Sequence, residues 1–314
     1  MSLIEKAVQR LEQLNNAQGV LKPDSPEMPQ ARLPNENLDA REAFPVPPAE
    51  VARESKREAG ARSREVSIDL GRLASMGMVT PDRPRSSIAE EYRVIKRPIL
   101  KNVVEGGVAN NKLIMVTSSL PGEGKSFTAI NLAISVAMEL DHTVLLVDAD
   151  VSRPSVLKTV GLQPERGLMD VLSEQSFDLS SFLLRTNIPK LSILPAGMPH
   201  ERSTEFLASD AMNRLLEDMA CRYSDRVIIF DSPPLIPTTE ARALATHMGQ
   251  IVMVVEAGRT TNGALRQALS TIEACPIKLM ILNKARDGGP GGYYGYGYGY
   301  GYGYGHAPEA AVEA

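Results

Sequence analysis

The sequence has few cysteines and no long apolar run. Its two cysteines, Cys221 and Cys275, match no metal-binding spacing, so we interpret them as small semi-buried residues in a reducing compartment. No apolar segment approaches the roughly 18–20 residues that span a bilayer, and residues 1–16 alternate charged with apolar side chains, unlike a signal peptide. We therefore expect a soluble, cytoplasmic protein that reaches a membrane only through a partner or a surface helix.

Positive charge is not concentrated anywhere in the chain. Lys and Arg number 34 against 38 Asp and Glu, which gives a formal charge of -4. Nucleic-acid-binding domains usually carry a basic stripe or patch. We therefore expect no nucleic-acid partner.

The composition changes three times along the chain, which indicates four regions. Residues 1–16 carry an apolar stripe at three- and four-residue steps, which predicts an amphipathic helix that either docks on its own domain or binds a partner. Residues 17–64 contain seven prolines, few aromatic residues and many charges, a composition that predicts a disordered linker. We expect residues 65–285 to form the folded domain and residues 286–314 to form a flexible Gly/Tyr-rich tail.

Short runs of Val, Ile and Leu alternate with helix-like stretches across the predicted domain. The runs are apolar on both faces, as expected for buried parallel strands. This alternation predicts an α/β fold with a doubly wound, mostly parallel sheet. The predicted strands are residues 112–117, 143–148, 191–194, 226–231, 250–256 and 277–283, and the predicted helices are residues 125–140, 204–223, 239–248 and 263–274.

Residues 119–126 have the composition and the context of a phosphate-binding P-loop, because they follow a predicted strand and precede a predicted helix. Gly122 and Gly124 let backbone N–H groups turn toward phosphate oxygens, and the helix N-terminus adds unsatisfied donors. Lys125 would reach the β- and γ-phosphates, and the Ser126 hydroxyl would ligate Mg²⁺. The residues that we assign to nucleotide binding are Pro121, Gly122, Glu123, Gly124, Lys125, Ser126, Phe127, Arg153 and Asn283.

Carboxylates follow two more predicted strands, with Asp148 and Asp150 after one and Asp231 after the other. Open α/β sheets bind ligands at the carboxyl ends of their strands. A lone Asp at such a place is usually a turn or helix cap, but three Asp residues downstream of a P-loop favour Mg²⁺ binding and proton transfer. We assign Ser126, Asp150 and Asp231 to the metal, and Lys125, Asp148, Asp150 and Asp231 to catalysis.

Three of these segments together resemble the Walker A, A′ and B motifs of bacterial P-loop tyrosine kinases. They are residues 119–126, the Asp-x-Asp-x-x-Arg-Pro segment at residues 148–154, and the Asp-Ser-Pro-Pro segment at residues 231–234. Ser119 replaces the first glycine of the P-loop consensus, so the Walker motifs are deviant. The likeness covers residues 86–285, and the Tyr-rich tail completes it. The first seven residues further resemble autokinases that accompany exosortase-linked exopolysaccharide systems.

The resemblance implies an ATP- and Mg²⁺-dependent autokinase. Lys125 and Ser126 would bind phosphates and magnesium, and Asp231 would be the Walker B carboxylate. Asp148 and Asp150 would manage magnesium and the incoming tyrosine hydroxyl, one of them as the base, and the sequence leaves open which one. A phosphoryl transfer of this kind needs mainly positioning and charge neutralisation, which these residue types supply.

The resemblance also implies a homo-oligomeric ring. Glu90, Arg93 and Lys96 match the family's Glu-x-x-Arg-x-x-Arg segment, which joins subunits. The third position is Lys, which lacks the bidentate fork of Arg, and Arg97 is adjacent. The alternative interpretation of this segment is an exposed charged helix.

Seven of the nine tyrosines lie in the tail, separated mostly by single glycines. We interpret them as phosphoacceptors that enter the active site of a neighbouring subunit. They are Tyr293, Tyr294, Tyr296, Tyr298, Tyr300, Tyr302 and Tyr304.

The resemblance implies partners as well. One is a membrane chain-length-determinant (polysaccharide co-polymerase) protein that activates the kinase, and another is a tyrosine phosphatase. The kinase would then lie peripheral to the inner membrane through its partner and regulate exopolysaccharide polymerisation or export.

Two other functions remain open at this point. A partition or division-site ATPase would share the fold, but such proteins carry a signature lysine five positions before the P-loop lysine, where this chain has Leu120. A non-catalytic nucleotide-binding assembly protein would use the Gly/Tyr tail for association. Phosphotyrosine formed from ATP would distinguish the kinase from both.

Overall fold

A computed structural model describes residues 63–108, 110–174, 179–222 and 225–285. The predicted N-terminal helix, almost all of the predicted linker and the Gly/Tyr tail lie outside these ranges. In chain order, the elements are β1 (Arg64–Val66), α3 (Leu70–Ser75), α4 (Ser87–Glu105), β2 (Leu113–Ser118), α5 (Lys125–Ala137), β3 (Thr143–Asp148), α6 (Val156–Val160), α7 (Leu168–Ser173), η1 (Leu179–Ser181), β4 (Leu184–Thr186), β5 (Leu191–Leu194), α8 (Ser203–Leu207), α9 (Asp210–Arg222), β6 (Arg226–Asp231), α10 (Thr239–Ala245), β7 (Gln250–Glu256), α11 (Asn262–Ser270) and β8 (Ile277–Asn283).

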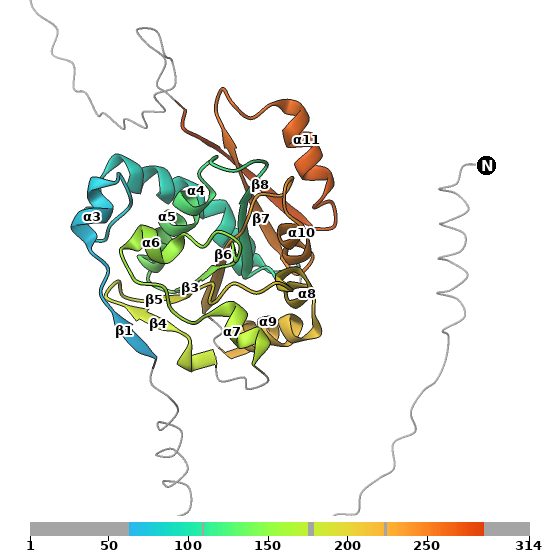
Figure 1. The fold of residues 1–314 in the computed structure, drawn as a ribbon. Coiled ribbons are helices and arrows are strands. Elements are labelled where there is room, and N and C mark those ends of the chain that lie inside the picture. Colours follow the sequence, from blue (N-terminus) through green and yellow to red (C-terminus); the bar gives the residue numbers. More distant parts are fainter. Residues whose placement is uncertain (1–62, 109, 175–178, 223–224, 286–314) are drawn as a thin grey trace, which may run out of the picture. The chain divides into compact units, whose positions relative to one another are not determined.

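One twisted sheet organises the described residues, with the strand order β1-β4-β5-β3-β6-β2-β7-β8. Every neighbouring pair is parallel except β4 and β5, which run antiparallel. Figure 1 shows helices on both sides of this sheet. The predicted doubly wound, mostly parallel α/β fold is confirmed.

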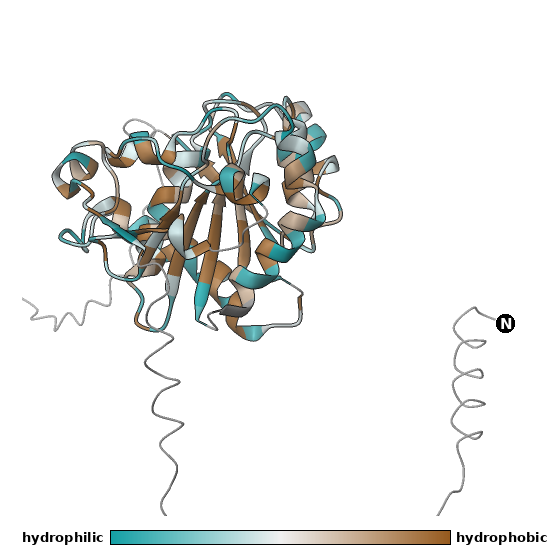
Figure 2. Cartoon of the chain, turned by 60° about the horizontal axis from the view of Figure 1, so that its bottom comes forward, coloured by the Kyte–Doolittle hydropathy of each residue, from teal (hydrophilic) through white to brown (hydrophobic). Residues whose placement is uncertain are grey.

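The central strands bury both of their faces, because successive side chains point to opposite sides. In β2, Ile114 and Val116 pack with α3, α4, α5 and α6, whereas Leu113 and Met115 pack on the side of α7 to α11. The same alternation continues in β3, β6 and β7. Figure 2 shows these strands as an apolar layer at the centre of the fold. Two hydrophobic cores therefore hold the sheet rigidly from both sides.

The six predicted strands are present, five with the predicted bounds, and β2 is shifted by one residue. The predicted helix 204–223 is wrong as a single element: α8 ends before Ser209, whose hydroxyl then accepts a hydrogen bond from the Met212 N–H at the start of α9. A serine hydroxyl that accepts a backbone N–H three residues later favours the start of a new helix over the continuation of α8. The three-residue strands β1 and β4 are too short to produce an apolar run, and we did not predict them.

Helix α4 is joined to the end of α5 by a buried charge. The Lys96 side chain is 5% exposed, and its Nζ donates to the Ser135 carbonyl oxygen at 2.6 Å and pairs with the Glu139 carboxylate at 2.7 Å. Burial alone would raise the pKa of Glu139, but Lys96 and the more exposed Arg97 outweigh this effect and lower it. The ion pair therefore compensates for burying an ammonium group between the two helices.

Removal of the Glu139 carboxylate should destabilise the fold. We expect Glu139→Ala to lower the free energy of unfolding by about 1–3 kcal/mol, because the buried Lys96 ammonium keeps only a carbonyl partner. Arg97→Ala is the matched control, since the Arg97 side chain is 63% exposed, and should change stability by no more than about 0.5 kcal/mol. Urea unfolding followed by circular dichroism measures both, and equal losses in the two variants would contradict the interpretation.

Candidate active site

The P-loop, residues 119–124, connects β2 to α5 and has a backbone that requires glycine at two positions. Gly122 and Gly124 have φ angles of +86° and +105°, a region that residues with a Cβ rarely adopt. A Cβ at Gly124 would also lie 2.0 Å from Nδ2 of Asn283. The Asn283 Nδ2 donates to the Glu123 carbonyl oxygen at 2.9 Å, and the Lys284 Nζ donates to the Gly122 carbonyl oxygen at 2.7 Å. The end of β8 therefore supports the loop from outside.

The Glu123 side chain supports the loop from inside. It is 1% exposed, and its carboxylate accepts the Leu120 N–H at 2.8 Å and the Thr260 hydroxyl. Thr260 lies between β7 and α11, so the loop is fastened to that connection as well. The Glu123 carboxylate therefore holds the loop in shape, and the assignment of this residue to nucleotide binding stays a prediction.

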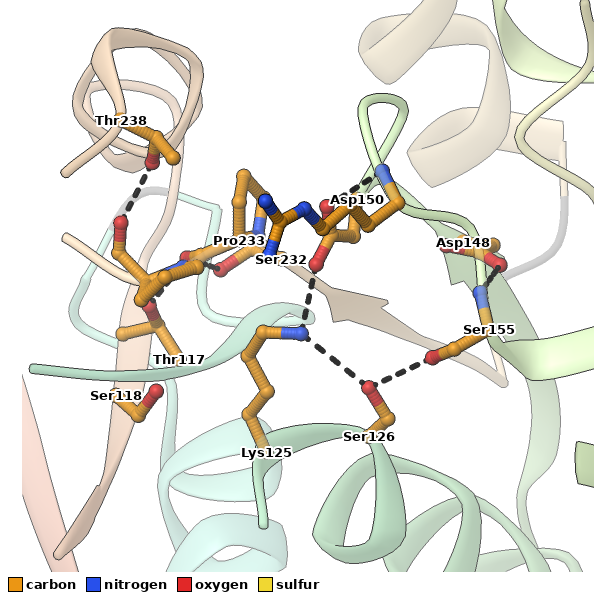
Figure 3. A network of polar contacts seen from close by, with 12 residues as sticks. Thr117, Ser118, Lys125, Ser126, Asp148, Asp150, Ser155, Ser232, Pro233 and Thr238 are labelled. Carbon is orange, nitrogen blue, oxygen red and sulfur yellow. Dashed lines mark hydrogen bonds and ion pairs between the residues drawn. The ribbon is translucent and has the colours of Figure 1, made fainter. Parts of the chain in front are cut away.

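Three acidic residues reach the P-loop because the sheet register brings them there. Asp148 and Asp231 are the last residues of β3 and β6, and they are paired neighbours across these parallel strands. Asp231 is also paired with Val116 of β2, two residues before that strand ends. Figure 3 shows Asp148 and Asp150 on the same side of the P-loop helix as Lys125 and Ser126. The predicted clustering of these carboxylates at the carboxyl ends of the strands is therefore present.

Lys125 is turned toward the acidic cluster. Its Nζ donates to Oδ2 of Asp150 at 2.7 Å and lies 3.4 Å from the Ser126 hydroxyl. The Ser155 hydroxyl donates to the Ser126 hydroxyl at 2.9 Å. Sequence reasoning missed Ser155, and the only signal for it is its position just before the short helix α6, where a serine commonly begins a helix.

Two carboxylates are buried without full hydrogen-bonding partners. Oδ2 of Asp148 accepts the backbone N–H groups of Ser155 and Val156 at 3.1 and 3.0 Å, but its Oδ1 has no donor. Neither carboxylate oxygen of Asp231 makes a well-formed hydrogen bond, although the Ser126 and Ser155 hydroxyls lie close enough to influence it. Asp148 is 1% exposed and Asp231 is fully buried.

This arrangement changes the acidity of several groups. Burial, and then the charge of Asp231, raises the pKa of Asp148 to about 7. Burial raises the pKa of Asp231 to about 6 despite the opposing charge of Lys125. Burial alone would lower the pKa of Lys125, but the carboxylates of Asp231, Asp150 and Asp148 raise it above its ordinary value. The site therefore favours the protonated forms of Asp148 and Asp231 and the charged form of Lys125.

The unpaired oxygens fit a divalent cation. Both oxygens of Asp231 are buried acceptors that lack donors, and the Ser126 hydroxyl faces the same carboxylate. No three His, Cys, Asp or Glu side chains within the described ranges form a closed metal cage. A cation here would complete its coordination with phosphate oxygens and water, which is the manner in which Mg²⁺ usually binds.

Comparison with known proteins places this site in a family. The sequence model of a family described as an AAA domain matches residues 111–283, which include the P-loop and all three aspartates. Tyrosine-protein kinase YwqD of Bacillus subtilis strain 168 is 31% identical over 229 residues, which are 72% of this chain and 94% of that protein. The chain belongs to the bacterial tyrosine-protein kinases.

Other relatives agree with this family. The succinoglycan biosynthesis transport protein ExoP of Rhizobium meliloti strain 1021 is 32% identical over 228 residues, and the match covers 71% of this chain but only 28% of that longer protein. The solved BceF tyrosine kinase domain is 28% identical with a TM-score of 0.55, and the match covers 74% of this chain and 88% of that domain. The predicted P-loop tyrosine kinase is therefore confirmed. The likeness of the first seven residues to exosortase-associated kinases stays a prediction.

The other residues outside the P-loop contacts described above that we assigned to nucleotide binding differ in their exposure to solvent. Arg153 is exposed, and its backbone N–H donates to Oδ1 of Asp150 at 3.2 Å. Phe127 packs partly against the core on the side of α5, so its side chain belongs to the fold. Pro121 is exposed in the P-loop. Of these three residues, Arg153 alone has an exposed charged side chain next to the carboxylates of this kinase.

The three residues predicted to join kinase subunits do not share one exposed surface. Glu90 is exposed on α4, Arg93 is partly exposed, and the two form an ion pair at 2.5 Å. Lys96 instead points into the fold and pairs with Glu139, because its position on α4 faces α5. Arg97 follows it and is largely exposed. Within the described residues, no helix is both long and apolar enough to cross a membrane.

The raised pKa of Asp231 predicts a characteristic pH dependence. Because the unfolded chain releases this proton at a lower pH than the fold does, the wild type should lose stability as pH rises from about 4 to about 6. Asp231→Asn removes this titration, so its stability relative to the wild type should improve by about 1–3 kcal/mol between about pH 4.5 and pH 8.

Urea unfolding of the nucleotide-free kinase at both pH values measures this effect. Asp148→Asn should improve in the same direction, since the pKa of Asp148 is raised as well. Parallel stability curves for the wild type and both variants would show that the two carboxylates titrate normally.

Proposed function

We propose that this tyrosine kinase transfers the γ-phosphoryl group of ATP, with Mg²⁺, to the tyrosines of its own Gly/Tyr tail. The observation that carries the proposal is the cluster of buried, unpaired carboxylate oxygens beside Lys125 at the P-loop. Such a cluster is unfavourable in isolation, but it suits a site that binds a metal and a polyphosphate.

On the phosphate side, the P-loop binds the nucleotide with a backbone that is already held in shape. Lys125 exchanges its contact with Asp150 for the β- and γ-phosphate oxygens, where its charge offsets the negative charge that spreads in the transition state. Bound Mg²⁺, held by Ser126 and Asp231 with Asp150 near it, would neutralise the same oxygens. Release of Asp150 from Lys125 leaves a carboxylate to join that metal shell directly or through water.

Asp148 is the better candidate for the base that receives the tyrosine proton. Two backbone N–H groups fix its Oδ2, and Oδ1 has no donor and can accept the phenol O–H. Its pKa of about 7 lies close to the working pH, which suits a general base. In the transfer, the tyrosine oxygen bonds to the γ-phosphorus, the bond from this phosphorus to the bridging oxygen breaks, and ADP leaves. The phenol proton passes to Asp148.

The described residues that precede the tail lie beside the P-loop, since Asn283 and Lys284 contact the P-loop carbonyls and Ala285 is the last described residue. From there to the middle of the tyrosines is about 13 residues, a typical coil span of roughly 20 Å. The acceptor must approach the γ-phosphoryl group from the carboxylate side, away from this starting point. We therefore propose transfer to the tail of a neighbouring subunit.

A homo-oligomeric ring would present such neighbours. Exposed Glu90 and partly exposed Arg93 on α4 are the proposed contacts, with exposed Arg97 as a substitute for the buried Lys96. Each phosphate adds about -1.5 to -2 charges, so several on each tail would repel one another and loosen the ring. A tyrosine phosphatase would reverse the change.

The biological setting follows from the relatives. ExoP is named for succinoglycan biosynthesis and transport. We propose that this kinase likewise regulates exopolysaccharide polymerisation or export, and that a membrane co-polymerase activates it and holds it at the inner membrane. The apolar stripe of residues 1–16 is the proposed contact with that partner.

Intact mass after incubation with Mg-ATP tests the activity. The wild type should gain several phosphates that all map to residues 293–304, and Lys125→Met should gain none, because it lacks the cation that binds the phosphates. ATP consumed without phosphate on the protein, even with the cytoplasmic segment of the activator added, would instead indicate an ATPase of the partition type.

Mixed subunits test the direction of transfer. A Lys125→Met chain with an intact tail is incubated with an active chain that ends at residue 285, in the presence of Mg-ATP. We expect phosphate on the tail of the inactive chain, since that tail can enter the active neighbour. An unmodified tail in the mixture, alongside normal autophosphorylation of the wild type, would mean that each subunit modifies only itself.

A further inference from the structure

Strand β8 has the composition of a buried strand but lies at the edge of the sheet. It pairs with β7 on one side, and no described strand lies on its other side (Figure 1). Exposed edge strands usually carry charges, prolines or bulges that discourage further pairing. Lys278 is the one charged residue of β8, and its Nζ is held by the carbonyl oxygens of Glu273 and Cys275. The outer edge of β8 is therefore suited to accept another strand.

One face of β8 leaves apolar side chains in solvent. The parallel register places Met280 beside Met253 and Leu282 beside Val255 of β7, so these side chains point to the same side of the sheet. Met253 is fully buried on that side, whereas Met280 and Leu282 are 62% and 64% exposed. The apolar layer of the sheet thus continues to its edge, where none of the described residues covers it.

The sequence of the tail has the pattern that would cover such a face. Successive side chains of an extended strand point to opposite sides. Residues 291–305 would then place glycine on one side and a row of tyrosines on the other, namely Tyr294, Tyr296, Tyr298, Tyr300, Tyr302 and Tyr304. Aromatic rings pack well on methionine and leucine, and the phenol hydroxyls can stay in water. The row of rings therefore suits the exposed face of β8.

The chain connection favours the tail of the same subunit. Strand β8 ends at Asn283, and the Gly/Tyr run begins at residue 291. The connecting residues include Gly288, Gly289 and Pro290, which are typical of turns. A connection of this length is sufficient to reverse the chain and return it along β8. A short tether also gives a segment a high effective concentration at its own subunit.

We propose that the unphosphorylated tail docks as an antiparallel strand along the outer edge of β8 of its own subunit, with tyrosine rings on Met280 and Leu282. Backbone hydrogen bonds to the edge strand supply affinity, and the rings on the exposed face supply register. Glycine at every second position makes ordering the tail costly, so the docked tail can also leave. This docking does not depend on the proposed function, whereas its control by phosphate rests on it.

Phosphate on the tyrosines would release the tail. Tyrosines two residues apart on one face of a strand lie about 7 Å apart. Each phosphate carries about -1.5 to -2 charges, and this spacing is shorter than the screening length of about 8 Å at physiological salt. Neighbouring phosphates therefore repel in the docked strand, and the repulsion falls when the tail detaches. The edge of β8 would hold the unmodified tail and reject the modified one.

Photo-crosslinking in the full-length protein without ATP tests the docking. A benzophenone amino acid replaces Met280, and equal amounts of isotope-labelled and unlabelled chains are mixed before irradiation, so that mass spectrometry separates crosslinks within one chain from those between chains. We expect crosslinks from position 280 to residues 291–305 of the same chain. The matched control places the same group at Leu140, which is 86% exposed and separated from β8 by β6, β2 and β7.

Tail variants test the role of the aromatic rings. Replacing the seven tail tyrosines by phenylalanine should preserve the crosslinks, because the rings remain, whereas replacing them by serine should reduce the crosslinks at least about tenfold. Hydrogen exchange of β8 in chains without the crosslinker gives an independent readout. The backbone amides of residues 277–283 should exchange about tenfold more slowly with the wild-type or phenylalanine tail than with the serine tail.

Other occupants of this face would be recognised in the same experiment. Crosslinks mainly between chains would assign the edge of β8 to a second copy, and crosslinks to residues 1–16 would assign it to the N-terminal segment; either result overturns the proposal. Equal crosslinking to the tail from positions 280 and 140, or equal exchange of β8 with all three tails, overturns it as well.

Incubation with Mg-ATP before irradiation tests the release. The wild type should gain phosphate and lose its tail crosslinks, and the phenylalanine tail should keep them. Undiminished crosslinks from a fully phosphorylated tail would refute release by phosphate. A wild type that gains no phosphate would refute the proposed function, while the crosslinks and the exchange measured without ATP still decide the docking.

Discussion

The pairing of β3 with β6 is the constraint on which the site depends. In parallel register, the last residue of each strand is Asp148 or Asp231, so two carboxylates are forced side by side in a buried environment. Such an arrangement is unfavourable for folding unless the surroundings determine it strongly. The apolar faces of β2, β3, β6 and β7 supply the packing energy that offsets this cost, since a hydrophobic core lies on each side of these strands. The packing of the sheet therefore maintains an electrostatic strain that ligands can relieve.

A second set of contacts keeps the P-loop backbone in one conformation. Glu123 braces it from within, and the end of β8 braces it from outside. Neither contact neutralises the acidic cluster. The site thus combines a rigid loop, which lowers the entropic cost of ordering on binding, with a Lys125 side chain that pairs with Asp150 in this structure and that we propose moves to the phosphates.

Much of this was predictable from sequence, for identifiable reasons. Buried parallel strands leave long apolar runs, and the P-loop and the strand-end aspartates have fixed spacing, so fold and cluster could both be predicted. The three-residue strands β1 and β4 leave no such signal. The inward turn of Lys96 depends on which face of α4 meets α5, and the roles of Glu123 and Ser155 depend on contacts with distant segments. Local patterns do not encode these contacts.

The position of Lys284 next to the P-loop has a consequence for the order of events on the tail. Strand β8 fixes where the tail starts, and the tyrosines there have nearly identical glycine neighbours, so sequence preference cannot rank them. They differ in tether length, from eight residues beyond Ala285 for Tyr293 to nineteen for Tyr304. Effective concentration is greatest when a tether just spans the gap and falls slowly beyond it. If phosphate passes between neighbouring subunits as we propose, the distance between them would determine which tyrosines are phosphorylated first.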